Sequence, residues 1–409
     1  MKILFITEDK FPPYRPDVAV LFVEELVARG YQIDWLLQAQ DAQIGARTMA
    51  LGGGTAWIAR MDEGESRMAK FRKNVYDIAN DFKMFKLART GKYDFIQVKD
   101  KFVAALMALL AAKIYRLKFF YWLSFPIPEA MLYRVHEGIS RYPLVVYLRG
   151  RILKFLLYRV IMPNADHVFV QSDRMKDDVA EWGIAKDKLT PVPMGVSLSR
   201  VPYNGETLIN SSSRESGKMV VYLGALNRVR RIDFLIRAFG EVVGRVAGAK
   251  LCLVGAATEP GEENELKELA IELGIEDSTI FTGFLPMAEA WAYVGQADVA
   301  VSPFYPTPIL CSTSPTKLVE YMAMGKPVVV NDHPDQKKVI TESGGGICVT
   351  YDEHAFAAAI VELLNDPEQA RIMGVRGRRY IEQHRSYTVL ATQLDQRYRE
   401  LCQNAQTRM

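Results

Sequence analysis

The chain alternates short apolar runs with longer segments in which apolar residues recur at helical spacing. Residues 2–7 (KILFIT) and 32–37 (QIDWLL) are apolar runs of strand length, and the amphipathic segment between them, residues 17–30, ends at Gly30. Such runs predict buried strands, and a repeat near 3.6 residues predicts a helix. Alternation of strand and helix predicts a parallel sheet with helices on both faces.

The same alternation continues through the first half of the chain and then begins again. After a polar stretch at 203–218, which contains NSSSRESG, the apolar run at 219–226 (MVVYLGAL) starts a second series. The other predicted strands cover 93–98, 118–123, 167–172, 250–255, 279–284 and 297–303, and the helices between them include 102–115, 233–246 and 262–274. A chain of 409 residues is too long for one core. We therefore expect two doubly wound α/β domains, residues 1–197 and 198–387, with ligands at the carboxyl ends of their strands, facing a cleft between the domains.

Composition and charge narrow the functional classes. The chain is 49% apolar and 24% charged with a net charge of +3, an ordinary globular composition that argues against wholesale nucleic-acid binding. The longest apolar run, 102–112, is too short to span a bilayer, and the first residues lack the order of a signal peptide. Four cysteines without C-x-x-C spacing favour reduced thiols in the cytoplasm and no structural zinc.

Glycine-rich segments do not indicate a dinucleotide cofactor. The chain has glycine triplets at 52–54 and 344–346, but the first strand is joined to its helix by TEDKFPPYRPD (7–17). A G-x-G-x-x-G fingerprint would stand at that junction. The sequence thus argues against a nicotinamide or flavin enzyme.

Residues 314–329 (SPTKLVEYMAMGKPVV) have the pattern of a helix whose start faces a ligand. Ser314 is a suitable N-cap, Pro315 suits the first helical position, and Gly325 followed by a proline ends a helix expected at 315–324. The first backbone N–H groups form an anion site, and the carboxylate of Glu320 can accept hydrogen bonds from two sugar hydroxyls. A Ser-Pro cap more often only starts a helix. A helix end contributes about 0.3–1 kcal/mol to an exposed anion, so further cations are needed.

Three arginines supply such cations. Arg228, Arg230 and Arg231 lie at the turn between the strand at 219–226 and the following helix. A helix start is electrostatically unfavourable for cations, which favours an anionic partner over a solvated basic surface. Arginine binds phosphate with paired, charge-assisted hydrogen bonds.

Together these motifs resemble the retaining GT-B glycosyltransferases of family 4. The similarity is densest from residue 220 to 401, in VYLGALNRVRRIDFLIRAF (221–239), SPTKLVEYMAMGKPVV (314–329) and GGGICV (344–349). The resemblance implies two Rossmann-like domains facing a cleft. It also implies that a C-terminal helix, at about 388–409, returns to the first domain.

The resemblance also implies roles for individual residues in binding a nucleotide-diphospho-sugar. Arg230 takes the place of the family's diphosphate-binding lysine, with Arg228 or Arg231 beside it, and Glu320 takes the place of the glutamate that holds the ribose hydroxyls. The other positions implied at the donor site are Gly224, Phe284 near the nucleobase, Ser314, Thr316 and Lys317 near the phosphates, and Ser312 where the family has a second, sugar-binding glutamate. Ser124 lies near the place of a histidine beside the reacting centre, and Ala225 replaces an arginine.

The activity implied is retaining transfer of a sugar to a glycan or lipid-linked saccharide, as in bacterial polysaccharide or glycoconjugate biosynthesis. The leaving phosphate takes the acceptor proton on the same face, and the protein supplies orientation and charge stabilisation rather than a nucleophile. No D-x-D motif is present, so we expect neither a metal nor a cofactor beside the nucleotide-sugar co-substrate. A nucleotide-sugar epimerase of the same fold, or a non-catalytic nucleotide-sugar-binding partner, is the alternative.

A basic and aromatic segment indicates contact with a membrane surface. Residues 111–160 contain nine Lys or Arg and two acidic residues. Helical spacing from 146 to 162 places Arg151, Lys154 and Tyr158 on one side, and Leu153, Leu156, Leu157 and Val160 on the other. We predict peripheral association with anionic lipid on the cytoplasmic face of the inner membrane, through Arg149, Arg151, Lys154 and Arg159. The alternative is a core helix with a solvated basic face.

Overall fold

The computed structural model describes residues 1–40, 46–61, 64, 66–203, 218–259 and 261–403. The chain divides into an N-terminal unit, Met1–Pro193 with Tyr387–Met409, and a C-terminal unit, Met194–Ser386. The boundaries expected from the sequence were 197/198 and 387/388. Most of the polar stretch predicted as a connection, 204–217, lies outside the described residues.

The sheet of the N-terminal unit has eight strands in the order β3-β4-β2-β1-β5-β6-β7-β8. Its strands are β1 (Lys2–Phe11), β2 (Gln32–Ala39), β3 (Arg47–Leu51), β4 (Gly54–Ala59), β5 (Phe95–Lys99), β6 (Lys118–Leu123), β7 (His167–Val170) and β8 (Leu189–Pro191). Every pairing is parallel except β3 with β4. From β1 the chain adds strands first on one side, β2 and β4, and then on the other, β5 to β8. The strand order therefore reverses between β1 and β5, as in doubly wound sheets.

The antiparallel pair β3–β4 corrects the expectation of a wholly parallel sheet. Gly52 and Gly53 connect the two strands with φ of 54° and 70°. Two successive residues with positive φ form the tight turn that suits a hairpin, and glycine adopts this conformation without strain. The first glycine triplet is thus a hairpin turn.

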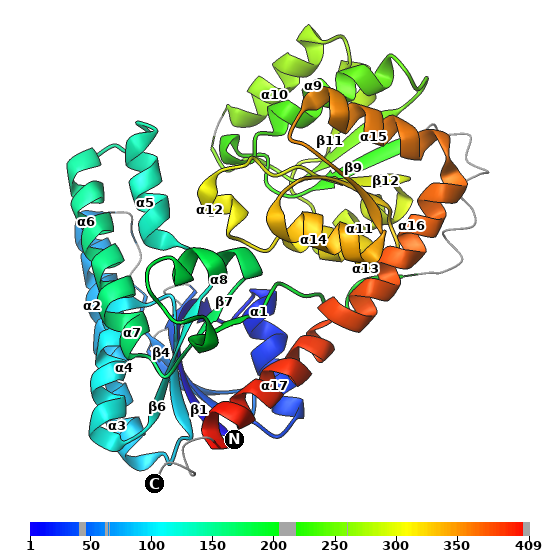
Figure 1. Ribbon diagram of the computed structural model, residues 1–409. Coiled ribbons are helices and arrows are strands. Elements are labelled where there is room, and N and C mark those ends of the chain that lie inside the picture. The colour runs from blue at the N-terminus through cyan, green and yellow to red at the C-terminus, as the bar shows by residue number, and fades with distance from the viewer. Residues whose placement is uncertain (41–45, 62–63, 65, 204–217, 260, 404–409) are drawn as a thin grey trace. The chain divides into compact units, whose positions relative to one another are not determined.

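Helices cover both faces of this sheet (Figure 1). They are α1 (Pro16–Ala19), η1 (Leu21–Leu26), α2 (Arg67–Asp81), α3 (Lys83–Thr90), α4 (Phe102–Tyr115), α5 (Ile127–His136), α6 (Pro143–Phe155), η2 (Leu156–Ile161), α7 (Met162–Asn164), α8 (Asp173–Ala180) and α17 (Tyr387–Gln403). On one face, buried alanines of α4 pack against Leu4, Ile6 and Ile96. On the other face, η1 and α17 pack against Phe5 and Trp35. The segment expected as one helix at 17–30 is a short α-helix followed by a π-helix.

The sheet of the C-terminal unit has six parallel strands in the order β11-β10-β9-β12-β13-β14. The strands are β9 (Met219–Leu223), β10 (Lys250–Val254), β11 (Thr279–Phe281), β12 (Val299–Ser302), β13 (Val328–Asn331) and β14 (Gly346–Val349). This is the 3-2-1-4-5-6 order of Rossmann folds, with its reversal between β9 and β12. The expected class of two doubly wound α/β units is confirmed.

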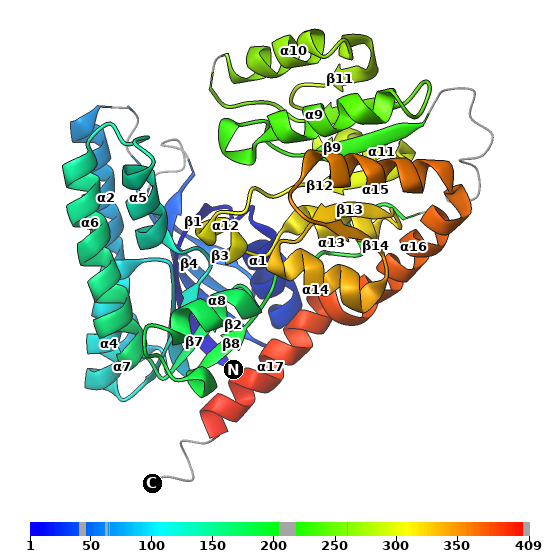
Figure 2. The same ribbon diagram turned by 45° about the horizontal axis from the view of Figure 1, so that its top comes forward.

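Helices also cover both faces of the second sheet (Figure 2). They include α9 (Ile232–Val243), α10 (Glu262–Glu272), α11 (Met287–Gln296), α12 (Pro308–Cys311), α13 (Thr316–Ala323), α14 (Pro334–Ser343), α15 (Glu353–Asn365) and α16 (Pro367–Tyr380). Residues of α9 and α15 build the core on one face, and residues of α11 and α13 build it on the other. No helix among the described residues is long and apolar enough to span a membrane.

Candidate functional site

Helix α13 begins one residue later than the sequence predicts, and Ser314 does not cap it. Pro315 occupies the N-cap position with φ −69° and ψ 123°, and no side chain caps the helix there. The Ser314 hydroxyl instead donates to Asp335 Oδ2 at 2.7 Å and accepts from the backbone N–H of Met194 at 3.0 Å. Ser314 therefore fixes the loop before α13, and its hydroxyl is engaged within the protein.

Lys317 and Arg230 meet at one aromatic surface at the reversal point of the second sheet. The Lys317 ammonium lies 5.0 Å from the ring centre of Tyr222 on β9 and 5.6 Å from that of Phe304, which follows β12. The guanidinium of Arg230 lies 5.7 Å from the same Phe304 ring. Ligands of doubly wound sheets bind at this position, and the structure brings two predicted cations together there.

Gly224 makes room for the Lys317 side chain. It follows β9 with φ 153°, a conformation that favours glycine. A Cβ at this position would collide with Lys317 Cε and lie 2.9 Å from its Nζ. The backbone N–H of the preceding residue, Leu223, donates to the hydroxyl of Tyr321 at 2.6 Å, which ties α13 to the end of β9.

Burial shifts the pKa values of two ionisable side chains of α13 to about 7. Burial, together with the positive charge of Arg230, lowers the pKa of Lys317 to about 7, against the opposing effect of Glu320. Burial raises the pKa of Glu320, one turn further along the helix, to about 7, against the effect of Lys317. A bound anion would favour protonated Lys317 and relieve the repulsion between the two cations. The arrangement suits a phosphate at Lys317 and Arg230, with a carboxyl group one turn away.

The other two arginines of the turn have carboxylate partners. Arg228 donates through Nε to Glu265 Oε2 at 3.0 Å, and Arg231 Nη2 lies 2.9 Å from Asp233 Oδ2. Arg231 has a positive φ of 52°, which turns the chain into α9. The three arginines are therefore not one cluster.

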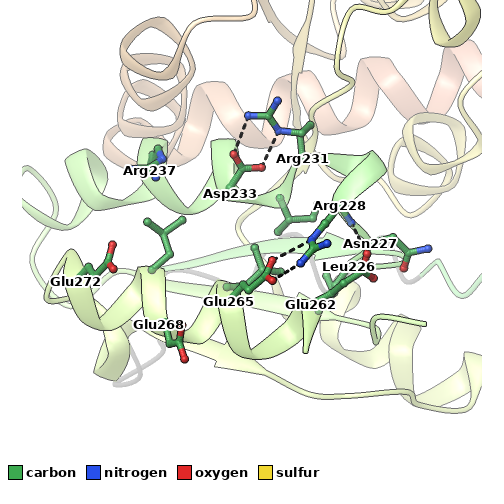
Figure 3. Close-up of a pocket in the computed structure, with 13 residues that line it drawn as sticks. Leu226, Asn227, Arg228, Arg231, Asp233, Arg237, Glu262, Glu265, Glu268 and Glu272 are labelled. Atoms are coloured by element: carbon green, nitrogen blue, oxygen red, sulfur yellow. Dashed lines mark hydrogen bonds and ion pairs between the residues drawn. The ribbon is translucent and has the colours of Figure 1, made fainter. Parts of the chain in front are cut away.

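Arg228 and Arg231 line a groove of about 470 Å³ between α9 and α10 (Figure 3). The acidic residues of the groove are Asp233, Glu262, Glu265, Glu268 and Glu272. Arg230, Lys317 and Glu320 are not part of its lining. Because carboxylates outnumber arginines in this groove, we assign the phosphate-binding chemistry to the aromatic surface at Lys317 instead.

The remaining residues predicted at the donor site lie in different surroundings. Ser312 is buried at the end of α12, and Thr316 is half-buried in the first turn of α13. Phe284, predicted near the nucleobase, follows β11 and is 85% exposed. An exposed ring of this kind has a free face for stacking.

Ser124, the candidate in the first unit, belongs to a buried polar cluster after β6. Its hydroxyl donates to Asp100 Oδ2, and its backbone N–H donates to Asp100 Oδ1 at 2.9 Å. Asp100 follows β5 with φ 58°, and burial raises the pKa of its carboxyl group. The guanidinium of Arg15 lies 3.5 Å from the Ser124 hydroxyl.

Sequence reasoning missed the ionic network beside Ser124. Lys99 Nζ lies 3.0 Å from Asp9 Oδ2 and 2.8 Å from Asp17 Oδ2, and the lysine side chain is 1% exposed. Burial, together with the carboxylates of Asp100 and Asp9, raises the pKa of Glu8 to about 7. The signal was present in the charged residues that directly follow apolar strands, in TEDK (7–10) and VKDK (98–101).

This network has more acids than bases. Four carboxyl groups, of Glu8, Asp9, Asp17 and Asp100, face two cations, Lys99 and Arg15. Burial raises the pKa of Asp100, and burial with two neighbouring carboxylates raises that of Glu8, which favours the protonated forms of these two acids. The cluster lies at the reversal point between β1 and β5, where a carboxyl group of this kind can hydrogen-bond a hydroxyl-bearing ligand.

The structure places the predicted membrane residues on α6 and η2. Arg149, Arg151 and Arg159 are exposed, whereas Lys154 is half-buried, 3.4 Å from Glu129. Tyr158, predicted on one side with Arg151 and Lys154, lines a groove together with both of them and is buried at 4% exposure.

Solved structures share this two-unit architecture. Sucrose-phosphate synthase from Thermosynechococcus elongatus aligns with a TM-score of 0.74 at 19% identity, over 98% of this chain and 99% of that one. Anabaena HepE, solved in complex with UDP, aligns with a TM-score of 0.67 at 16% identity, over 98% and 100%. The fold is that of the GT-B glycosyltransferases.

Two family models match successive parts of the chain. Glycosyltransferase Family 4 matches residues 18–200, and Glycosyl transferases group 1 matches residues 206–380. The chain belongs to family 4 of the GT-B glycosyltransferases.

Two curated relatives have a lipid in their names. Alpha-monoglucosyldiacylglycerol synthase of Streptococcus pneumoniae is 25% identical over 69% of this chain and 61% of its own length. A GDP-mannose-dependent phosphatidylinositol monomannoside mannosyltransferase of Mycolicibacterium smegmatis is 31% identical over 40% of this chain and 42% of its own. The chain thus spans about half the length of these curated relatives.

Proposed function

We propose that the protein transfers a hexosyl residue from a nucleotide-diphospho-sugar to a lipid-linked saccharide or glycan. The observation that carries this proposal is the pair Lys317 and Arg230 at the Phe304 ring, with Glu320 one turn along α13. Two cations held near the same aromatic ring are suited to a diphosphate. A carboxylate beside them is suited to a pair of ribose hydroxyls.

The donor is bound by the C-terminal unit in this proposal. Lys317 and Arg230 pair with the diphosphate, Glu320 accepts from the ribose, and Phe284 offers a face to the base. The names of two similar proteins support a nucleotide-sugar donor, since HepE was solved with UDP-glucose and the mycobacterial relative is called GDP-mannose-dependent. Ser312, a hydroxyl where the family has a glutamate, lies beside the transferred sugar.

Transfer proceeds with retention at the anomeric carbon. The bond from that carbon to the diphosphate breaks, and the acceptor oxygen bonds to it on the same face. The acceptor proton passes to the departing phosphate oxygen, so no protein nucleophile and no metal are required. Lys317 and Arg230 stabilise the charge that develops on the leaving group.

The acceptor is bound by the N-terminal unit. Carboxyl groups at the β1–β5 reversal point, together with Ser124, hydrogen-bond its hydroxyls. The exposed apolar and basic surface of α6 supports an acceptor at an anionic membrane, and both curated relatives described above carry a lipid in their names. We place the reaction on the cytoplasmic face of a bacterial inner membrane, in glycoconjugate or polysaccharide assembly.

Calorimetric titration with UDP- and GDP-sugars tests the donor site. We expect Arg230→Ala and Lys317→Ala each to weaken binding by about 10- to 100-fold, because one hydrogen bond to a charged group contributes about 1.5–3 kcal/mol. Arg245→Ala is the matched control, because Arg245 is exposed and pairs with Glu241. Unchanged affinity in both site variants would contradict the assignment.

Turnover separates this function from its alternatives. A transferase consumes the donor only when an acceptor or water receives the sugar, and the anomeric coupling in the product's NMR spectrum reports retention or inversion. Isomerisation of the donor without any acceptor would indicate an epimerase. Binding without turnover would indicate a non-catalytic partner. Activity that survives EDTA would agree with metal independence.

A further inference from the structure

Helix α6 presents an apolar face outward. Leu144, Leu148, Ile152 and Phe155 are 69%, 52%, 59% and 61% exposed, and their spacing places them on one side of the helix. The chain continues into η2, where Leu157 is fully buried on the inner side. In Figures 1 and 2, α6 packs against α5 at the edge of the N-terminal unit. A contiguous apolar surface of this kind marks an interaction site.

A basic groove lies directly beside this apolar face. It has a volume of about 190 Å³ and is lined by Arg151, Lys154, Phe155, Tyr158, Arg159 and Trp182. Tyr158 and Trp182 stack with ring centres 5.1 Å apart and planes inclined by 22°. The Lys154 ammonium lies 4.2 Å from the centre of the Trp182 ring. Phe155 belongs to both the apolar face and the groove, so the two surfaces are continuous.

The groove carries net positive charge. Lys154 is partly neutralised by Glu129 at 3.4 Å. Across the described part of the chain, Arg151 and Arg159 have no carboxylate partner, and both are exposed. Two guanidinium groups and an ammonium at one small groove favour an anion with several oxygen atoms, such as a phosphate.

We propose that this groove binds the phosphate of an anionic phospholipid headgroup while the apolar face of α6 enters the bilayer interface. This inference rests on the membrane association proposed above and gives it a specific contact. Arg151 and Arg159 pair with the phosphate, and Leu148, Ile152 and Phe155 contact the acyl chains. Tryptophan and arginine both suit the depth at which headgroups lie, because each has an apolar part and a polar end.

Charge favours a lipid surface over a protein partner. Protein interfaces are depleted of charge at their apolar centre. Here three basic residues border the apolar face, as they do on helices that lie in an anionic interface. Binding of another protein, or of a second copy of the chain, is an outcome of the experiments below.

Sedimentation of the full chain with vesicles tests the groove. The vesicles are phosphatidylcholine with or without phosphatidylglycerol. The groove variant is Arg151→Gln with Arg159→Gln, and its charge-matched control is Arg141→Gln with Arg149→Gln, two exposed arginines that do not line the groove. Both variants lose two positive charges and therefore the same long-range attraction to anionic vesicles. The difference between their vesicle affinities reports the contribution of the groove.

We expect the groove variant to bind phosphatidylglycerol vesicles at least about tenfold more weakly than the control, as the loss of one hydrogen bond to a charged group predicts. Leu148→Ser with Ile152→Ser weakens binding to the same vesicles without changing the lipid preference. Equal loss in the groove variant and its control would overturn the headgroup site. Absence of vesicle binding would also overturn it. Vesicle-independent dimerisation that the serine pair abolishes would overturn it in favour of a second copy of the chain.

Trp182 gives a second readout. The difference in emission between the wild type and Trp182→Phe is followed with dihexanoyl phosphatidylglycerol, dihexanoyl phosphatidylcholine and inorganic phosphate. We expect the anionic lipid to shift the Trp182 emission at concentrations at least about tenfold lower than inorganic phosphate, because it also buries acyl carbons. Equal responses to lipid and inorganic phosphate would overturn the lipid assignment.

Nucleotide-sugar binding without vesicles separates this inference from the proposed function. The groove variant must keep the donor affinity of the wild type, since Arg151 and Arg159 belong to the N-terminal unit. A chain that binds vesicles through the groove but no nucleotide-sugar would retain the groove and refute the transferase. A chain that binds the nucleotide-sugar, but whose groove variant binds vesicles as well as the control variant does, would retain the donor site and refute the groove.

Discussion

At the scale of single residues, the candidate donor site depends on a lysine held partly neutral. Burial and the charge of Arg230 lower the pKa of Lys317 to about 7, and a bound diphosphate raises it again. Protonated Lys317 is fully present below that pKa, and its fraction falls as the pH rises through it. Above pH 7, donor binding must therefore take up a proton, and affinity declines as the pH increases.

Calorimetry in two buffers of different ionisation enthalpy measures this proton uptake. The ligand is a nucleotide-diphospho-sugar, whose phosphates do not titrate near neutrality. We expect uptake of up to about one proton at pH 8, since a group with a free-state pKa near 7 is then mostly deprotonated. Lys317→Met abolishes the uptake, whereas Glu320→Gln retains it. Persistence in Lys317→Met would assign the proton to another group.

Gly224 is the second residue-scale determinant, because it gives Lys317 its space. We expect Gly224→Ala to weaken donor binding by about tenfold or more, the loss of one charged hydrogen bond. The control is Gly244→Ala, where φ is −66° and the nearest atom would lie 3.7 Å away. Titration and thermal unfolding of both variants check this. A similar loss of affinity in Gly244→Ala would indicate a general effect of destabilising the unit.

At the scale of elements, the sequence pattern predicted most of what positions the site. Helix 102–115 and strand 118–123 were predicted with the bounds that α4 and β6 have, because their apolar runs end at sharp changes of pattern. The hairpin β3–β4 was missed because a glycine triplet specifies a turn only when two strands flank it. The π-helical turn in η2 was not predicted, because apolar spacing over six residues does not distinguish it from an α-helical turn.

Side-chain partners were harder to predict than elements. Three arginines within four residues look alike in sequence, yet Arg228 and Arg231 pair with Glu265 and Asp233, while Arg230 lies near Phe304. Those partners come from other elements or from a backbone turn with positive φ, which periodicity does not encode. Ser314 likewise bonds Asp335, which is 21 residues away. Local chemistry thus identified the region, and tertiary packing decided which groups meet.

The tie between α13 and β9 gives an element-scale prediction. The buried Tyr321 hydroxyl accepts the N–H of Leu223, and Tyr321→Phe leaves that donor without this partner. We expect the free energy of unfolding of the C-terminal unit to fall by about 1–3 kcal/mol, the cost of an unsatisfied buried group. Urea unfolding measures it, with half-buried Tyr293→Phe on α11 as the control. Equal stability of the two variants would show that this hydrogen bond contributes little.

At the scale of the whole molecule, each unit has its own core, and the N-terminal unit is built from two separate parts of the chain. Helix α17 comes after the C-terminal unit in sequence but belongs to the N-terminal unit. Tyr398 on α17 stacks parallel to Phe120, with ring centres 6.0 Å apart, and donates to Gln97 at 2.5 Å. The last helix therefore completes the first core, and the donor site on α13 lies within the other unit.

Replacement of Tyr398 should separate the two units energetically. We expect Tyr398→Ala to destabilise the N-terminal unit by about 3–5 kcal/mol, the cost of deleting a buried aromatic ring. Because Lys317, Arg230 and Glu320 belong to the C-terminal unit, donor affinity should stay within about twofold of the wild type, as for distant, independent sites. Excess nucleotide-sugar stabilises only the unit that binds it, so in Tyr398→Ala it should raise the midpoint temperature of one of two unfolding transitions.

Gln393→Ala, on the exposed side of the same helix, is the control and should leave the midpoint temperatures of both units unchanged. A single transition, or a parallel loss of donor affinity, would show that the donor site depends on the first core.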